Sequence, residues 1–210
     1  MISLSEILHT IAQALMIPCL IILIILMAGA VWQIGDIVVE FVAERRKHKC
    51  NVPQLLRDVH TAGADGLADL IENSGLLRRQ KKALLELAES RGLPKDTLTA
   101  LAERLLATEE ARNAHTTSVT DMIAKLGPMF GLLGTLIPLG PGIVALGQGD
   151  TVTLSESMNV AFDTTIAGVI SAAVASVISH IRKRWYNDDM VSLETLMEAV
   201  LEEVTADVEG

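Results

Sequence analysis

Thr135 and Thr165 are hydroxyl residues that lie within long apolar stretches of the sequence. A hydroxyl group can both donate and accept hydrogen bonds, so such residues are able to line a hydrated path through apolar surroundings. The same hydroxyl can instead donate to a carbonyl of its own helix, four residues earlier, and only fill space between helices. The residue type leaves both interpretations open, and the surrounding elements must decide between them.

Small residues accompany both threonines at helical spacing. At about 100° per residue, each set occupies one arc of about 100° on its helix. Small residues allow helices to approach closely inside a membrane, where no hydrophobic force brings them together. The pattern predicts an antiparallel hairpin in which the helix-packing residues are Gly127, Gly131, Gly134, Gly168 and Ala172.

The composition is that of a membrane protein. Half of the residues are hydrophobic, the mean hydropathy is +0.41, and three stretches are almost free of charge. Each stretch exceeds the roughly 20 residues that cross a hydrocarbon core of ~30 Å. We therefore predict three transmembrane helices, at about residues 10–34, 126–148 and 157–181.

The basic residues predict the orientation of these spans. Fourteen of the seventeen Lys and Arg residues lie between Arg45 and Lys125, beginning with the cluster Arg45–Lys49, and the other three are Arg182, Lys183 and Arg184. Cytoplasmic flanks retain Lys and Arg, whereas exported loops lose them. The protein is expected in the cell membrane as a multi-pass protein with its N-terminus outside and its C-terminus in the cytoplasm.

The remaining segments read as helical, which gives an all-α integral membrane protein with long helical cytoplasmic extensions. Apolar residues recur every three or four positions, with breaks near Gly63 and Ser74-Gly75, and the helix that starts near Pro94 continues into span two. Thr153 and Glu156 have capping-box spacing, which predicts that span three starts near Thr153. The predicted domains are the first transmembrane helix at 1–44, a cytoplasmic helical domain and stalk at 45–125, the transmembrane hairpin at 126–181, and a cytoplasmic acidic tail at 182–210.

The acidic tail also carries an apolar stripe of near-heptad type, which predicts that it packs on the stalk or on a neighbouring subunit. Residues 185–210 hold eight acids and no base, which argues against a nucleic acid partner. The stripe is formed by Tyr186, Met190, Leu193, Met197, Val200 and Val204.

Two sequence motifs surround the threonines: P-M-F-G-L-L-G-T from Pro128 to Thr135, and A-F-D-T-T-I-A-G from Ala161 to Gly168. These segments resemble the signature segments of the MotA/TolQ/ExbB proton channel family, in the same order along the chain. The three-span layout is similar to the TolQ/ExbB branch. By this resemblance, Thr135 and Thr165 correspond to the family's two channel threonines and are the expected ion-pathway residues.

The resemblance implies partners as well. It implies a homo-oligomeric ring, a pentamer, around a single-span partner that resembles ExbD or TolR and carries a transmembrane aspartate. The chain itself has no acid that would evidently lie midway along a small-residue face, which agrees with an aspartate supplied by a second protein.

Several other polar residues leave alternatives open. Asp163 and Thr164 are possible ion-pathway residues, and the alternative for Asp163 is an interfacial residue or a contact between subunits. Asp36 and Glu40, four residues apart at the cytoplasmic edge of span one, are expected to form a solvated helix face, with a proton exit as the alternative. Pro138 and Pro141 are expected to kink or loosen the outer half of span two, since proline lacks the backbone N–H of a helix interior.

The expected function is that of a channel-forming subunit of a proton-driven, energy-transducing motor complex. No nucleotide-binding loop, metal-ligand spacing or nucleophile and base pair is recognisable, so we expect no enzymatic activity, no cofactor and no metal site. Two alternatives remain: a non-conducting membrane scaffold, and a small-solute transporter that uses the helix break at Pro138 and Pro141.

Overall fold

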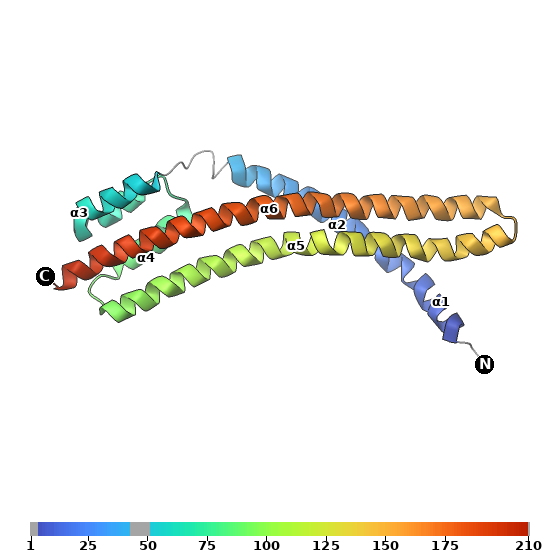
Figure 1. Ribbon diagram of the computed structural model, residues 1–210, viewed down its shortest axis with the longest axis horizontal. Coiled ribbons are helices and arrows are strands. Elements are labelled where there is room, and N and C mark those ends of the chain that lie inside the picture. Colours follow the sequence, from blue (N-terminus) through green and yellow to red (C-terminus); the bar gives the residue numbers. More distant parts are fainter. Residues whose placement is uncertain (1–3, 43–50, 210) are drawn as a thin grey trace. The chain divides into compact units, whose positions relative to one another are not determined.

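The computed structural model describes residues 4–42 and 51–209, and every regular element in this part of the chain is a helix (Figure 1). The predicted all-α fold is therefore confirmed. The basic cluster Arg45–Lys49 lies outside the described residues. The helices are α1 (Leu4–Ala14), α2 (Met16–Glu40), α3 (Val52–Asn73), α4 (Arg78–Glu89), α5 (Lys95–Gly147) and α6 (Thr151–Glu209).

The described residues divide into two compact units, and each is considered by itself. The membrane unit comprises those of Met1–Ile37 together with Thr117–Ile181, and the polar unit comprises those of Val38–Thr116 and Arg182–Gly210. Three helical segments are long and apolar enough to cross a membrane, which confirms the predicted three spans. They lie within Glu6–Glu40, Lys95–Gly147 and Thr151–Ala206.

The membrane unit is built on the hairpin of α5 and α6, whose backbones approach closely at the predicted glycines. A methyl group added to Gly127 would lie 2.6 Å from the carbonyl oxygen of Gly168, and one added to Gly168 would lie 2.9 Å from the Cα of Gly131. Ala172 contributes its small side chain at the same place, 3.0 Å from the methyl position of Gly127. The small faces of the two helices therefore pack against each other within one chain.

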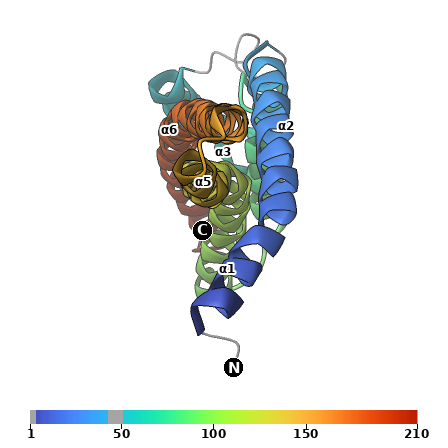
Figure 2. The same ribbon diagram turned by 90° about the vertical axis from the view of Figure 1, so that its right-hand side faces the viewer.

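The first span packs beside this hairpin (Figure 2). Leu26 and Ala30 of α2 form a buried cluster with Ile123 of α5 and Ala175 of α6. The boundary between α1 and α2 follows from Pro18, which has no N–H to donate to the carbonyl of Ala14, the last residue of α1. The helical bonding resumes at once, because the N–H of Cys19 donates to Leu15 at 3.0 Å.

Proline does not interrupt the second span. Pro128, Pro138 and Pro141 all lie inside α5, and the helix continues to Gly147. Pro138 and Pro141, which are expected to kink or loosen the outer half of span two, therefore do not break the helix. Pro138 is buried and lies one turn from Gly134, where α6 packs closely, and such support from a neighbouring helix allows proline within a transmembrane helix.

The loop between spans two and three ends before the predicted capping box at Thr153, so span three starts earlier than expected. Helix α6 begins at Thr151, and Asp150 provides its cap, accepting the N–H groups of Val152 and Thr153 at 3.2 and 3.1 Å. Thr153 donates its hydroxyl to the same carboxylate, and this bond, followed by its N–H, lowers the pKa of Asp150. The predicted Thr153 and Glu156 cap is therefore wrong. Gly149 has a φ of 79°, which glycine adopts without strain in so tight a turn.

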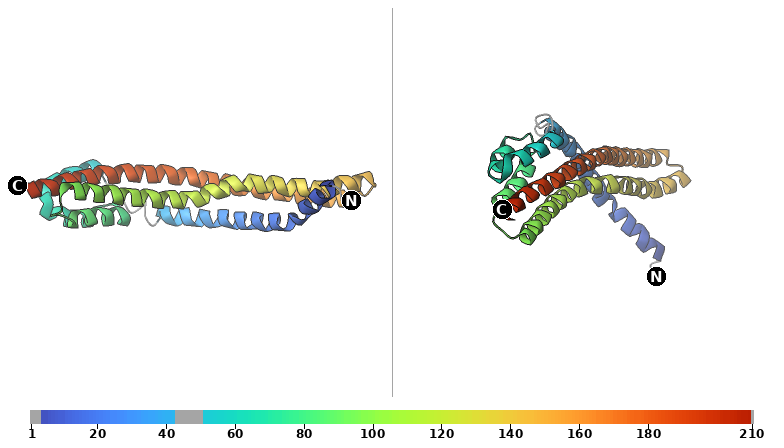
Figure 3. Two further views of the ribbon diagram at one scale, coloured as in Figure 1. Left: turned by 90° about the horizontal axis from the view of Figure 1, so that it is seen from below. Right: turned by 60° about the vertical axis from the view of Figure 1, so that its left-hand side comes forward.

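The polar unit has a core of its own, formed where α3 and α4 pack against the unit's parts of α5 and α6 (Figure 3). The apolar stripe of the tail supplies Leu193, Met197, Val200 and Val204, which are at most 2% exposed. Their partners include Leu84 and Leu87 of α4. The predicted packing of the tail is thus confirmed, and it involves the chain's own helices.

The two predicted breaks in this unit are also confirmed. Gly63 has a φ of 64° and interrupts the helical geometry inside α3, and α3 ends at Asn73, just before Ser74-Gly75. The helix that starts after Pro94 continues without interruption into the second span as α5. Glycine is suited to the first break because it adopts a positive φ without a steric penalty.

An ion pair joins α2 and α6 in the polar unit. The guanidinium Nε of Arg182 donates to the carboxylate of Glu40 at 3.2 Å, and Arg182 is 1% exposed. Beside it, Phe41 and Trp185 stack with ring centroids 6.0 Å apart. Burial, followed by the charge of Glu40, raises the pKa of Tyr186 to about 12. The expectation that Glu40 lies on a solvated helix face is wrong, because Glu40 pairs with a buried cation.

Gly168→Ala should destabilise the hairpin by about 1–3 kcal/mol, because the added methyl overlaps the backbone of α5 and cannot be accommodated by a side-chain rotation. Thermal unfolding of the detergent-solubilised protein, followed by circular dichroism, measures the loss. Gly140→Ala is the matched control, since nothing lies within 4 Å of a methyl group at that position of α5. Equal melting temperatures for the two variants would contradict the close approach of the helices.

Glu40→Ala should lower the stability of the protein by about 3 kcal/mol, because it removes the carboxylate that pairs with a buried guanidinium. Glu40→Leu combined with Arg182→Met should recover most of the loss, since the double variant leaves no buried charge. Glu103→Ala removes an exposed acid on α5 and serves as the control. The measurement is the melting temperature of the unchanged protein and of these three variants. A Glu40→Ala variant as stable as Glu103→Ala would refute the stabilising role of the ion pair.

Candidate functional site

The packing of the hairpin places Thr135 and Thr165 at the same level of the membrane unit. A methyl group on Gly131 would lie 3.7 Å from the Cα of Thr165, and one on Gly134 would lie 2.6 Å from the Cβ of Thr164. Thr135 follows Gly134 directly in α5, and Thr165 follows Thr164 directly in α6. The register between the two helices therefore brings both hydroxyl-bearing turns to one height.

Thr164 lies in the contact between the two helices. It is 5% exposed and occupies the space that the missing side chain of Gly134 leaves open. Its hydroxyl donates to the carbonyl of Ala161 at 2.9 Å. Thr164 thus fills the helix interface within one chain, and its oxygen faces the backbone of α5.

Thr135 and Thr165 lie one position further around their helices, at the edge of this interface, and both are half-buried. The hydroxyl of Thr135 donates to the carbonyl of Leu132 at 2.6 Å, and that of Thr165 donates to Ala161 at 3.0 Å. A hydroxyl that donates to its own helix retains lone pairs that can accept a hydrogen bond. Both side chains can therefore receive a donor from water or from a second protein at the edge of the hairpin.

Asp163 lies on a different side of α6 from the packed face. Its side chain is exposed, and its neighbours Phe162 and Ile166 are exposed large apolar residues. In a membrane protein this surface meets lipid or another protein chain. The structure thus keeps Asp163 apart from the interface at Gly131 and Gly134.

Two polar contacts that the sequence pattern does not reveal link the helices at the end of the unit that lies farthest from the Asp150 loop. Thr120 of α5 is fully buried and donates to the side chain of Gln33 in α2 at 3.2 Å. Ser179 of α6 donates to the carboxylate of Asp121 in α5. The available signal was weak: Ser179 belongs to the small-residue arc, and Asp121 continues the helix that enters span two.

Arg182 was predicted only as a basic flank of span three. A stronger signal was present, because Arg182 continues the three-and-four spacing of the buried positions Ala175, Ile178 and Ser179. A cation at the end of such a face is expected to meet a partner helix. The structure supplies that partner as Glu40 of α2.

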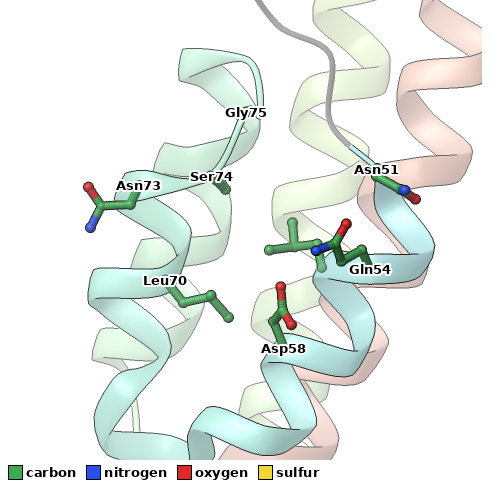
Figure 4. A pocket seen from close by; sticks show the side chains of 8 residues that line it. Asn51, Gln54, Asp58, Leu70, Asn73, Ser74 and Gly75 are labelled. Carbon is green, nitrogen blue, oxygen red and sulfur yellow. The ribbon is translucent and has the colours of Figure 1, made fainter.

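The polar unit contains a shallow open pocket of about 300 Å³ between the two arms of α3 (Figure 4). Gln54, Asp58 and Leu70 face this space, whereas Asn73 points away from it. Asp58 is the one ionisable side chain among the residues that line the pocket. The Ser74 hydroxyl in this lining donates to the carbonyl of Ile71 at 2.6 Å. The family motifs lie in spans two and three, so we place the candidate site in the membrane unit.

Comparison with known proteins agrees with the geometry of the hairpin. Residues 70–195 match the MotA/TolQ/ExbB proton channel family, and this match includes all of spans two and three. No curated protein matches this sequence. The match covers more than half of the chain, and it contains the two motifs that carry Thr135 and Thr165. The chain therefore belongs to the MotA/TolQ/ExbB proton channel family.

Proposed function

We propose that this protein is the channel-forming subunit of a proton-driven, energy-transducing complex, in which several copies surround a partner that carries a transmembrane aspartate. The observation that carries the proposal is the common level of Thr135 and Thr165 in a hairpin that belongs to a proton channel family. Both hydroxyls lie at the edge of the helix interface, where they can accept a hydrogen bond from a group outside the chain.

A second protein is needed because this chain supplies no suitable carrier between its threonines. The stretch from Gly127 to Gly147 contains no acid, and Asp163 is the only acid between Ser157 and Ile181. Since Asp163 is exposed on another side of α6, it does not face the packed surface. A carboxylate within a membrane span is costly and functional by default, so a partner aspartate is the natural proton carrier.

The proposed orientation places the N-terminus outside and both the 51–125 segment and the tail in the cytoplasm. The distribution of Lys and Arg supports it, because none of these residues flanks the outer end of a span. The proposed ring contains five copies, in line with the resemblance noted from the motifs. We propose ion conduction coupled to mechanical work, without covalent chemistry.

Thr135→Val and Thr165→Val test the assignment of the ion path. Valine keeps the shape of threonine and removes the hydroxyl, so each variant in complex with the partner should conduct protons about tenfold more slowly, the equivalent of one lost hydrogen bond in the barrier. A pH-sensitive dye inside vesicles measures the flux. Thr164→Val is the matched control, because this hydroxyl is enclosed between α5 and α6, and its flux should stay within about twofold of the unchanged protein.

Equal fluxes for all three valine variants would refute the ion path. They would instead favour the non-conducting scaffold, in which the threonine hydroxyls only bond to their own helices. The transporter alternative predicts a different result, namely solute accumulation without a partner and a strong response to Pro138→Ala. The unbroken helix at Pro138 provides no unwound segment of the kind that such transporters use.

The dependence on a partner forms a separate prediction. Vesicles that contain this protein alone should conduct no protons above background, whereas vesicles that also contain a single-span partner should conduct. Replacing the transmembrane aspartate of the partner with asparagine should abolish the flux, because the amide cannot carry a proton. Native mass spectrometry of the purified complex should give five copies of this chain, and proton conduction by the chain alone would contradict the proposed arrangement.

A further inference from the structure

The contact between Asp121 and Ser179 lies at the far end of the hairpin from the Asp150 loop. Ser179 is 2% exposed and donates its hydroxyl to the Asp121 carboxylate, which is half-buried. The two residues come from α5 and α6, so the bond crosses the same interface that the glycines form deeper in the membrane unit. An acid is thus held at one end of the hairpin by a fixed donor.

The positions of the two residues match those of the channel threonines. Asp121 precedes Thr135 by fourteen residues, and Ser179 follows Thr165 by fourteen residues. Fourteen residues advance a helix by about 21 Å and return it to within about 40° of the starting direction. Because the helices are antiparallel, both steps lead toward the same end of the hairpin. Asp121 and Ser179 therefore lie below the threonines on nearly the same side of each helix.

A structural link alone does not explain the choice of an acid. The neighbouring bond between Thr120 and Gln33 joins α5 to α2 with neutral groups. A carboxylate in a half-buried position has a desolvation cost that a neutral partner would avoid. A carboxylate can also bind and release a proton, whereas the amide and hydroxyl groups of the neighbouring pair cannot do so near neutral pH.

We propose that Asp121 is the proton-accepting group at the cytoplasmic end of the channel and that Ser179 holds its carboxylate in position. An O–H bond forms on one carboxylate oxygen when a hydronium ion in the path gives up a proton, and the O–H bond that breaks leaves a neutral water molecule. The bond breaks again when cytoplasmic water accepts that proton, and the carboxylate returns to its starting state. Ser179 donates to the carboxylate and is neither consumed nor changed. This inference rests on the proposed function and on the proposed orientation.

The test uses the complete complex with its partner in vesicles and compares Asp121→Asn, Asp121→Glu and Ser179→Ala. Asparagine can accept the Ser179 hydrogen bond through its carbonyl but cannot carry a proton, so proton flux should fall about tenfold or more. Glutamate retains an acid and should restore most of the flux. Addition of formate, a small weak acid, should accelerate the asparagine variant and leave the unchanged protein unaffected, once the proton entry that formic acid brings to protein-free vesicles is subtracted; a purely structural residue would not give this response.

Ser179→Ala separates the two roles. It removes the bond between the helices while the carboxylate stays, so it should reduce flux by no more than about threefold, less than 1 kcal/mol in the barrier. If Ser179→Ala and Asp121→Asn lose proton flux equally, or if formate does not accelerate Asp121→Asn, Asp121 has a structural role and the inference is wrong. Melting temperatures and copy number of each complex show whether a variant is assembled.

The result also distinguishes this inference from the function on which it rests. If Thr135→Val slows the flux and Asp121→Asn does not, the channel assignment stands and the inference about Asp121 is wrong. If the unchanged complex conducts no protons, both are wrong. If Thr135→Val and Asp121→Asn both slow the flux, and formate restores only Asp121→Asn, the channel assignment and the inference about Asp121 are both supported.

Discussion

The close approach of two backbones is the constraint on which the membrane unit depends. Gly127 of α5 and Gly168 of α6 lie so close to the backbone of the opposite helix that neither position has room for a methyl group. Such contact gains dispersion energy and determines the register between the helices, and it replaces the hydrophobic force that is absent inside a membrane. The common level of Thr135 and Thr165, the enclosure of Thr164 and the bond between Asp121 and Ser179 all follow from this register.

Much of the fold could be predicted from periodicity, because the positions that pack in a helical protein repeat every three or four residues. The tail is an example: Leu193, Met197 and Val200 were assigned to an apolar stripe, and they lie in the core of the polar unit. The breaks at Gly63 and after Asn73 were predictable for the same kind of reason, since glycine and serine disfavour helix continuation. The three spans required only length and hydropathy.

The candidate site was predicted less completely, for two physical reasons. The arc of small residues is about 100° wide, and consecutive residues of a helix are also about 100° apart. The pattern therefore does not show which of the neighbours Thr164 and Thr165 lies in the contact between α5 and α6. Polar partners from different helices are also invisible to periodicity. Arg182 was assigned to a flank because its charge fitted the orientation, and its pairing with Glu40 depends on where α2 ends beside α6. The Asp150 cap was missed because a capping box one turn later had the expected spacing.

The short turn after α5 has a consequence for the biogenesis of the protein. Three residues, 148–150, separate α5 from α6, and the carboxylate of Asp150 is already bound to the N–H groups at the start of the next helix. In the proposed orientation this turn must cross the bilayer during synthesis. Few polar groups of the turn have to cross the bilayer, and several of them already form hydrogen bonds within the turn. Spans two and three can therefore enter the membrane together as one preformed pair.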